Sequence, residues 1–341
     1  MSEHYLGFWN LENLFAPEGF LGRPAWIERR VGRDLEGWTE ALFAQKISQL
    51  SQIITQMNGG EGPDILGVCE VENQFVLDKL VVKVRETLAD RDYRVIHAES
   101  ELDKRGIDTA FIYDAGRYQV VPEFVFSHFV LRRTGTRDIL QATFKTQAGN
   151  DLIIMSNHWP SRSGGAEKSA GFRATAGETV GYWHERIREV LGPRAALIVM
   201  GDLNDDPWDP SVTFNANATR ERGDVERAQS ARLYNLSWGY LKTEAIDHRG
   251  ERRQLDGTLY FSGNGNVFDQ ILVARPLLDG AGPFHLLEET AGIVAVPEMV
   301  SHRVSEGPRR FGLPRGDAAE NVDPEGYSDH FPVSVILRED S

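Results

Sequence analysis

Residues 195–207 read AALIVMGDLNDDP, an apolar run that stops at a glycine and is followed by acidic and amide side chains. A short, continuously apolar run is typical of a strand that is buried on both faces. Because Gly, Asn, Asp and Pro all form turns, a simple turn also explains the end of this run. A strand that ends at Asp202 and Asn204 nevertheless presents polar side chains at the rim of a rigid sheet, where functional residues commonly lie.

The same arrangement, a polar residue at the end of an apolar strand, recurs along the chain. Each case alone has a structural explanation, such as a turn residue, a solvated carboxylate or a buried structural histidine. Several in one chain favour a functional site assembled from strand ends. The other places are Asn10 after YLGFW, Glu70 after DILGVC, His158 after LIIMSN, Asp269 opening DQILV, and Asp329 with His330 before FPVSVIL.

Short apolar runs predict strands, and helical spacing of apolar residues predicts three longer helices. Strands and helices that do not strictly alternate favour an α+β fold of packed sheets over a Rossmann or barrel fold. We expect one domain over 1–341, with long loops at about 16–37 and 275–326, the second of which we interpret as a functional loop or lid. The predicted strands are 5–9, 64–69, 93–98, 109–113, 118–126, 139–146, 152–157, 195–200, 257–261, 267–273 and 331–337, and the predicted helices are 39–57, 73–88 and 167–191.

The composition is that of an ordinary globular protein, with 41% hydrophobic and 26% charged residues and a net charge of −14. This charge argues mildly against non-specific nucleic-acid binding but permits a local basic groove. The lone cysteine, Cys69, excludes an intramolecular disulfide and a cysteine-based metal site, and we expect it to point into the core, away from Glu70. No apolar run approaches the roughly 20 residues of a membrane span, and the first residues are unlike a signal peptide, so we expect a cytoplasmic protein.

Seven sequence blocks, in order from Phe8 to Leu337, resemble the endonuclease/exonuclease/phosphatase superfamily. The blocks are FWNLENLF, DILGVCEVEN, RGIDTAFIYD, SNHWPSR, GDLNDDP, FDQILVAR and YSDHFPVSVIL. The resemblance implies a four-layer αββα sandwich of two packed mixed β-sheets flanked by helices. It also implies divalent-metal-dependent phosphodiester hydrolysis with Mg²⁺ or Mn²⁺, ions that prefer oxygen ligands.

The resemblance also implies roles for individual residues. Glu70, Asn10 and Asp329 match the metal region. Asp202 matches the residue that orients or deprotonates the attacking water, and Asn204 matches the residue that holds a phosphate oxygen. His158 and His330 match the histidines that contact the scissile phosphate, and Asp269 matches the partner of His330. Asp108 is a candidate for the partner of His158, and Arg105 is an alternative functional residue in the same block.

Basic and aromatic residues beside these motifs are candidates for substrate contact. Arg162, Lys168 and Arg173 follow His158 and suit a phosphate clamp, although a solvated basic start of a helix explains them equally well. Four tryptophans next to motifs suit base stacking or, more commonly, a packing wall; they are Trp9, Trp26, Trp159 and Trp208.

Our preferred hypothesis is a nuclease that acts on DNA or RNA, with no obligate protein partner. The alternatives are a phosphatase or phosphodiesterase for a small or lipid phosphoester and, from another class, a catalytically inactive binding module. The complete set of polar strand-end residues argues against the binding module, because partner binding requires no such set.

Overall fold

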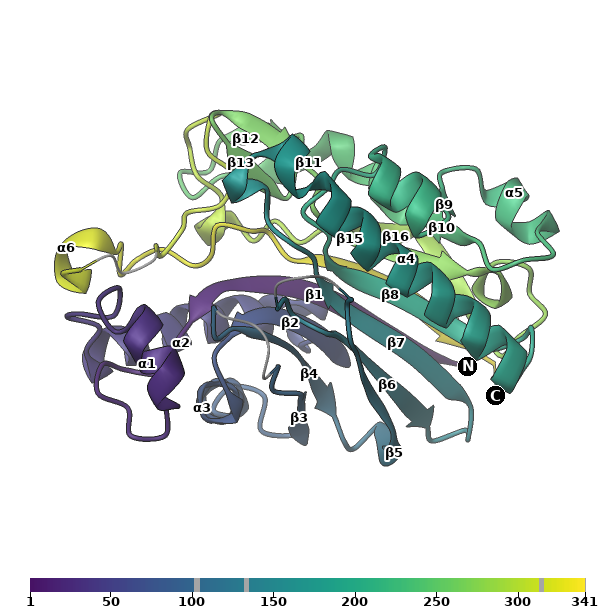
Figure 1. Ribbon diagram of the computed structural model, residues 1–341, viewed down its shortest axis with the longest axis horizontal. Helices are drawn as coiled ribbons and strands as arrows, with labels where there is room; N and C mark the ends of the chain where they lie inside the picture. Colours follow the sequence, from purple (N-terminus) through teal and green to yellow (C-terminus); the bar gives the residue numbers. More distant parts are fainter. Residues whose placement is uncertain (101–104, 132–134, 313–315, 341) are drawn as a thin grey trace.

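The computed structural model describes residues 1–100, 105–131, 135–312 and 316–340. Two β-sheets pack face to face, with helices on their outer faces (Figure 1). In spatial order the first sheet contains β16 (Phe284–Ile293), β17 (Val333–Glu339), β1 (Ser2–Leu14), β2 (Ile65–Val71), β4 (Asp108–Asp114) and β3 (Tyr93–His97). The second contains β5 (Tyr118–His128), β6 (Ile139–Thr146), β7 (Asp151–His158), β8 (Ala196–Asp202), β15 (Asp269–Ala274), β10 (Leu233–Asn235) and β9 (Ala218–Thr219).

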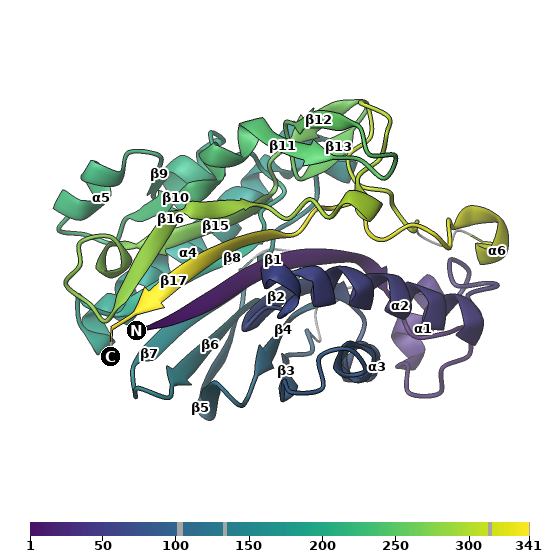
Figure 2. The same ribbon diagram turned by 180° about the vertical axis from the view of Figure 1, so that it is seen from behind.

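The helices complete the layers. Seen from behind, α2 lies along the first sheet beside β1 and β2, while α4 crosses the far face of the second sheet (Figure 2). The helices are α1 (Ala25–Val31), α2 (Glu40–Gln56), α3 (Gln74–Arg85), α4 (Ala166–Leu191), α5 (Arg222–Arg227) and α6 (Ala318–Asn321). Two hairpins extend one end of the sandwich. They are β11 (Thr243–Ile246) with β12 (Arg252–Leu255) and β13 (Leu259–Phe261) with β14 (Asn264–Asn266). The predicted αββα sandwich is confirmed.

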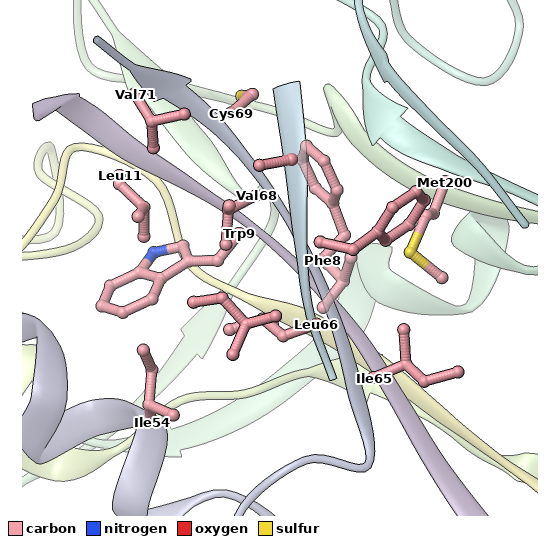
Figure 3. Packing of buried hydrophobic residues seen from close by; sticks show 14 of the residues in the cluster. Phe8, Trp9, Leu11, Ile54, Ile65, Leu66, Val68, Cys69, Val71 and Met200 are labelled. Carbon is pink, nitrogen blue, oxygen red and sulfur yellow. The ribbon is translucent and has the colours of Figure 1, made fainter. Parts of the chain in front are cut away.

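The alternation of side chains along β1 builds the contacts between layers. Figure 3 shows Phe8 facing Met200 of the second sheet, while its neighbour Trp9 points toward Ile54 of α2. Successive residues of a strand point to opposite faces, so one strand contributes to both interfaces. All four side chains are fully buried, which holds the central strands rigidly between the layers.

Strand register brings the polar strand ends together. β7 and β8 are parallel and place His158 opposite Asp202, while β15 is antiparallel to β8 and places Asp269 opposite the same residue. In the first sheet, β1 and β2 are parallel and pair Asn10 with Cys69, the residue before Glu70. The ends of these strands therefore converge at one end of the sandwich.

Two segments that we predicted as loops contain regular structure. Residues 284–293 form β16, which pairs with β17 at the edge of the first sheet, so the prediction of one long loop at 275–326 is wrong. The segment 16–37 contains α1. The short strands β9 to β12 and β14 were also not predicted from the sequence. Among the residues that the structure describes, no helix is both long enough and apolar enough to cross a membrane.

Candidate active site

The two histidines of the site have opposite electrostatic surroundings. His330 Nδ1 lies 2.7 Å from Asp269 Oδ2, and its Nε2 lies 3.9 Å from Asp202 Oδ2 and 3.8 Å from Asp329 Oδ1. Burial alone would lower the pKa of His330, but the charge and hydrogen bond of Asp269, with the charges of the other two aspartates, raise it well above its usual value. His330 is therefore an imidazolium at neutral pH.

His158 is held neutral instead. Its Nε2 lies 3.6 Å from Glu70 Oε1 and 3.7 Å from Asp202 Oδ2, and in the described part of the chain neither ring nitrogen has a hydrogen-bond partner. Complete burial, with positive charge from Arg137, Arg105 and His330, lowers its pKa well below the usual value. An unpartnered buried imidazole is costly in free energy, so these nitrogens are available for a ligand.

Two asparagines orient the carboxylate of Asp202. Asn10 Nδ2 donates to Asp202 Oδ2 at 3.1 Å, and the backbone N–H of Asn204 donates to Asp202 Oδ1 at 2.9 Å. Burial, with the nearby charges of Asp269 and Glu70, raises the pKa of Asp202 to about 6, against the opposing effects of His330 and of the Asn204 hydrogen bond. The predicted pair Asp202 and Asn204 is thus brought to the centre of the site, although the Asn204 amide donates to the Trp159 carbonyl at 3.0 Å.

Glu70 is aimed into the site by an unusual backbone conformation. Its φ is 61°, in the left-handed region that side chains other than glycine rarely adopt, and Asn204 has φ 51°. Glu70 Oε2 accepts from the backbone N–H of Asn13 at 2.9 Å, and Glu70 Oε1 lies 3.6 Å from Arg105 Nη2. Burial tends to raise the pKa of Glu70, but Arg105, His330, Arg137 and this hydrogen bond lower it. Glu70 is therefore ionised.

The carboxylates of the site fit a hard divalent cation. Burial raises the pKa of Asp329, and the negative charge of Glu70 acts in the same direction against His330 and Arg310. Carboxylates that destabilise one another's charge in a buried site are stabilised by a bound cation, and Mg²⁺ and Mn²⁺ prefer oxygen ligands. Glu70 and Asp329 are the carboxylates of the predicted metal region, while Asn10 uses its amide to hold Asp202 and its Oδ1 to accept from the Glu12 N–H.

A second set of possible metal ligands, which shares His158 and Asp202 with the site, is less suited to such an ion. Single ligand atoms of Cys69, His158 and Asp202 all lie within 4.8 Å of one another. Burial and three neighbouring carboxylates raise the pKa of the Cys69 thiol well above its usual value, and a thiol binds metal as the thiolate. Cys69 is buried as expected, and its thiol lies beside His158 and Asp202.

Both predicted phosphate-clamp arginines bind acidic residues of the protein. Arg162 Nη2 pairs with Asp205 Oδ1 at 2.7 Å and also with Asp209, and its guanidinium stacks over Phe268. Arg173 is 2% exposed and pairs with Asp205 Oδ1 at 2.7 Å. Their role as a phosphate clamp is therefore not supported, since both stabilise the loop after β8. Lys168 is exposed at the start of α4.

Asp108 does not pair with His158. Its Oδ2 lies 3.0 Å from His97 Nε2, and its Oδ1 accepts from the backbone N–H of Ser100 at 3.0 Å. No described residue forms a hydrogen bond with the ring nitrogens of His158, so the prediction that Asp108 is the partner of His158 is wrong. Arg105, the competing candidate of the same block, lies beside Glu70 instead and is partly exposed.

Sequence reasoning missed a charged cluster next to Asp329. Glu12 is fully buried, and its Oε1 accepts from Arg310 Nε at 2.8 Å while its Oε2 accepts from the Gly312 N–H at 3.0 Å. The buried Lys46 ammonium donates to the Glu12 carbonyl, and Arg310 Nη2 lies 3.9 Å from Asp329 Oδ2. Burial and the charge of Asp329 raise the pKa of Glu12 to about 7. The sequence signal that could have indicated this cluster is Glu12, the acidic residue of the block FWNLENLF.

The tryptophans divide between the two interpretations. Trp9 and Trp159 are buried and form packing walls: Trp9 Nε1 donates to the His330 carbonyl at 2.8 Å, and Trp159 Nε1 donates to Asn157 Oδ1 at 3.1 Å. Trp26 is 38% exposed, and Trp208 is 47% exposed, with its ring 5.5 Å from that of Trp238. Only the two exposed rings are accessible to a substrate.

Comparisons with known proteins agree with this geometry. The family model described as "Endonuclease/Exonuclease/phosphatase family" matches residues 5–339, and the search among curated proteins finds no match. A family protein from Bacteroides thetaiotaomicron has 18% identity over 100% of this chain and 99% of its own, with TM-score 0.56. A mannosyl-6-phosphatase from the same organism has 18% identity over 98% and 99%, with TM-score 0.53. The human Nocturnin catalytic domain, solved with sulfate, has 14% identity over 99% and 95%, with TM-score 0.52.

At these identities the solved structures establish the fold alone, whereas the family model covers nearly the whole chain, including every strand that carries a site residue. The chain therefore belongs to the endonuclease/exonuclease/phosphatase family of metal-dependent phosphoesterases.

Proposed function

We propose that this protein hydrolyses phosphodiesters of DNA or RNA with Mg²⁺ or Mn²⁺. The observation that carries the proposal is that a charged His330 and a neutral His158 both lie within 4 Å of the oriented carboxylate of Asp202, at 3.9 Å and 3.7 Å from its Oδ2. One group that accepts a proton and two that donate hydrogen bonds are what hydrolysis of a phosphodiester requires.

Asp202 is the candidate base. Both of its oxygens are fixed by hydrogen bonds from Asn10 and Asn204, so its direction is set before a substrate binds. A pKa of about 6 leaves it ionised at neutral pH and basic enough to accept a proton from an attacking water.

The histidines are the candidate phosphate ligands. His330 would donate from Nε2 to a phosphoryl oxygen or to the leaving oxygen, with its charge maintained by Asp269. His158 would donate from one ring nitrogen without adding charge. Arg105 and Arg310, whose side chains are 39% and 58% exposed, lie 3.6 Å from Glu70 and 3.9 Å from Asp329 and would attract the anionic substrate.

Glu70 and Asp329, with Asn10 nearby, would hold the divalent ion. When bound, it supplies positive charge that offsets the acidic site and stabilises charge on the phosphoryl oxygens. The carboxylates themselves position that charge, because Glu70 is fixed by the Asn13 N–H and by its backbone conformation.

Hydrolysis assays test this function directly. Plasmid DNA, single-stranded RNA and bis-p-nitrophenyl phosphate are incubated with Mg²⁺, Mn²⁺ or EDTA, using wild type, His330→Ala and the matched control His285→Ala on the edge strand β16. We expect metal-dependent cleavage of a nucleic acid that falls by about 10²–10⁴-fold in His330→Ala and not in the control.

The other outcomes decide between the alternatives. Cleavage of the small ester alone would reject the nuclease and move the proposal to a small or lipid phosphoester. No hydrolysis of any substrate would reject the enzyme in favour of a binding module. In a parallel titration, Glu70→Gln should raise the Mg²⁺ concentration for half-maximal rate, whereas the exposed control Glu61→Gln should not; equal titrations would reject Glu70 as a ligand.

A further inference from the structure

A cavity of about 300 Å³ lies at the opposite end of the second sheet from the candidate active site. Its walls come from the last turns of α4, from the residues just before β8 and from the residues just after β15. Since Asp202 and Asp269 lie at the other ends of β8 and β15, the two sites are separated by the length of a strand, roughly 20 Å. The residues of interest in its lining are His184, Arg188, Arg194, Arg232, Arg275 and Asp279.

The cavity concentrates positive charge on an acidic protein. Four arginines and one aspartate line it, whereas the whole chain has a net charge of −14. Asp279 is already engaged, because its Oδ2 lies 2.8 Å from Arg275 Nε. The charges of the other three arginines have no carboxylate partner among the described residues.

The arginine atoms themselves have unused hydrogen-bonding capacity. Arg188 donates from Nη2 to the Gln229 carbonyl at 2.9 Å, but its Nε is buried without a partner in the described part of the chain. Arg232 Nε is likewise buried and unpartnered, and Arg194 is exposed at the cavity edge with no ion pair to any described side chain. Buried donors without acceptors are unfavourable, and an anion in the cavity would satisfy them.

A buried histidine completes the lining. His184 is 3% exposed and makes no hydrogen bond to another residue that the structure describes. Burial and the charge of Arg188 lower its pKa to about 3, so it is a neutral donor and acceptor beside the arginines.

We propose that this cavity is a second binding site, separate from the catalytic site, for a small molecule that carries a phosphate or diphosphate group. Guanidinium groups bind phosphate oxygens through paired, charge-assisted hydrogen bonds. The volume is at the low end of the range for small-molecule sites. A nucleic-acid backbone is typically contacted by exposed cations, whereas two of the donors here are enclosed, which favours a compact anion.

Calorimetric titration with inorganic diphosphate tests the site. The titration uses full-length protein in EDTA, with ionic strength matched by NaCl, so that the acidic catalytic site has no metal to bind the anion. We expect binding in wild type and in Arg94→Gln, an equal change of charge on β3 of the other sheet. Arg194→Gln and Arg232→Gln should each weaken binding about tenfold or more, while Arg194→Gln keeps its metal-dependent activity on bis-p-nitrophenyl phosphate.

Three results would overturn the proposal. The first is no heat beyond the NaCl control, and the second is equal affinity in the pocket variants and wild type, which would place the anion elsewhere. The third is binding of a single-stranded oligonucleotide, lost in the same variants, without binding of diphosphate. Arg194 is exposed and has no ion pair with any side chain that the structure describes, so its variant remains informative even if Arg232→Gln fails to fold.

Discussion

Asp269 Oδ2 and His330 Nδ1 lie 2.7 Å apart, and this contact joins the first residue of β15 to the residue immediately before Phe331-Pro332, which lead into β17. The contact spans 61 residues of sequence and couples the two sheets at the site. Both side chains are buried, so little solvent screens their attraction.

Replacement of Asp269 by asparagine should lower both the rate and the upper pH limit of catalysis. The raised pKa of His330 depends on this carboxylate, and the protonated form is the donor that we propose. Without the charge, His330 loses its proton at a lower pH, so the alkaline limb of the kcat/KM profile should move to lower pH. At pH 7 we expect a loss of about 10²–10⁴-fold.

The exposed Asp151→Asn is the matched control and should keep the wild-type profile. An alkaline limb at the same pH in Asp269→Asn would show that His330 is not the group that titrates.

Trp208→Ala should weaken cleavage of single-stranded nucleic acid without affecting the small ester. Trp208 is 47% exposed, and its ring is tilted against that of Trp238 at 5.5 Å. It follows Asn204 by four residues, so the Cα atoms of Trp208 and Asn204 are at most about 14 Å apart. Loss of a stacking ring costs about 1–3 kcal/mol per base, which predicts a rise of roughly 5- to 150-fold in KM for an oligonucleotide. Steady-state kinetics on both substrates measures this.

Tyr182→Ala on α4, where the ring is 57% exposed, controls for loss of any surface aromatic side chain. A parallel loss on the small ester in Trp208→Ala would indicate damage to the site rather than loss of stacking.

Arg173→Met should destabilise the fold rather than act through substrate binding. Arg173 is almost completely buried and pairs with Asp205, whose Oδ2 also accepts from Ser211 Oγ at 2.6 Å. Removal of one partner from a buried ion pair leaves an uncompensated charge and costs about 3–5 kcal/mol. Chemical denaturation measures the free energy of unfolding.

Lys168→Met, on the exposed first turn of α4, should unfold as wild type does. If Arg173→Met kept wild-type stability and instead raised KM, the clamp predicted from the sequence would be restored.

Acid should destabilise the protein partly through His184. Its folded pKa is about 3 against 6.5 when unfolded, so the unfolded state binds more protons between these values. This contribution to stability is complete above pH 6.5 and declines as pH falls, by about 2 kcal/mol between pH 7 and pH 5. Denaturation of His184→Phe should therefore show a smaller decline over this range.

His285→Phe, at a partly exposed site on β16, is the control. An undiminished pH dependence in His184→Phe would assign the acid sensitivity to other groups.

The fold was largely predictable because its central strands are buried on both faces. Residues 196–200 and 65–69 are continuous apolar runs, and their polar ends mark the site. β16 was missed because it lies at the sheet edge and carries Glu288, Glu289 and Gly292 in a mostly half-buried strand. An edge strand needs neither an apolar run nor clear alternation, so the pattern that predicts central strands does not detect it.

The site was predictable where a residue ends a strand and not where its role depends on distant partners. Glu12 and Arg310 are 298 residues apart, and the sequence gives no indication that they meet. Likewise, Arg162 and Arg173 follow His158 closely, as a phosphate clamp would, yet the acidic residues after β8 bind them. Which arginine pairs with which acid is decided by tertiary packing.

Glu12, Asn13, Glu70 and Asn204 all have positive φ angles, between 51° and 61°. Such conformations typically cost about 1–3 kcal/mol each for residues other than glycine, so the surrounding packing must hold them in place. Selection of variants for heat resistance alone would favour glycine at these positions, although the side chains are what aim the site. At these four positions, higher thermal stability would therefore require glycine, whereas activity requires the present side chains.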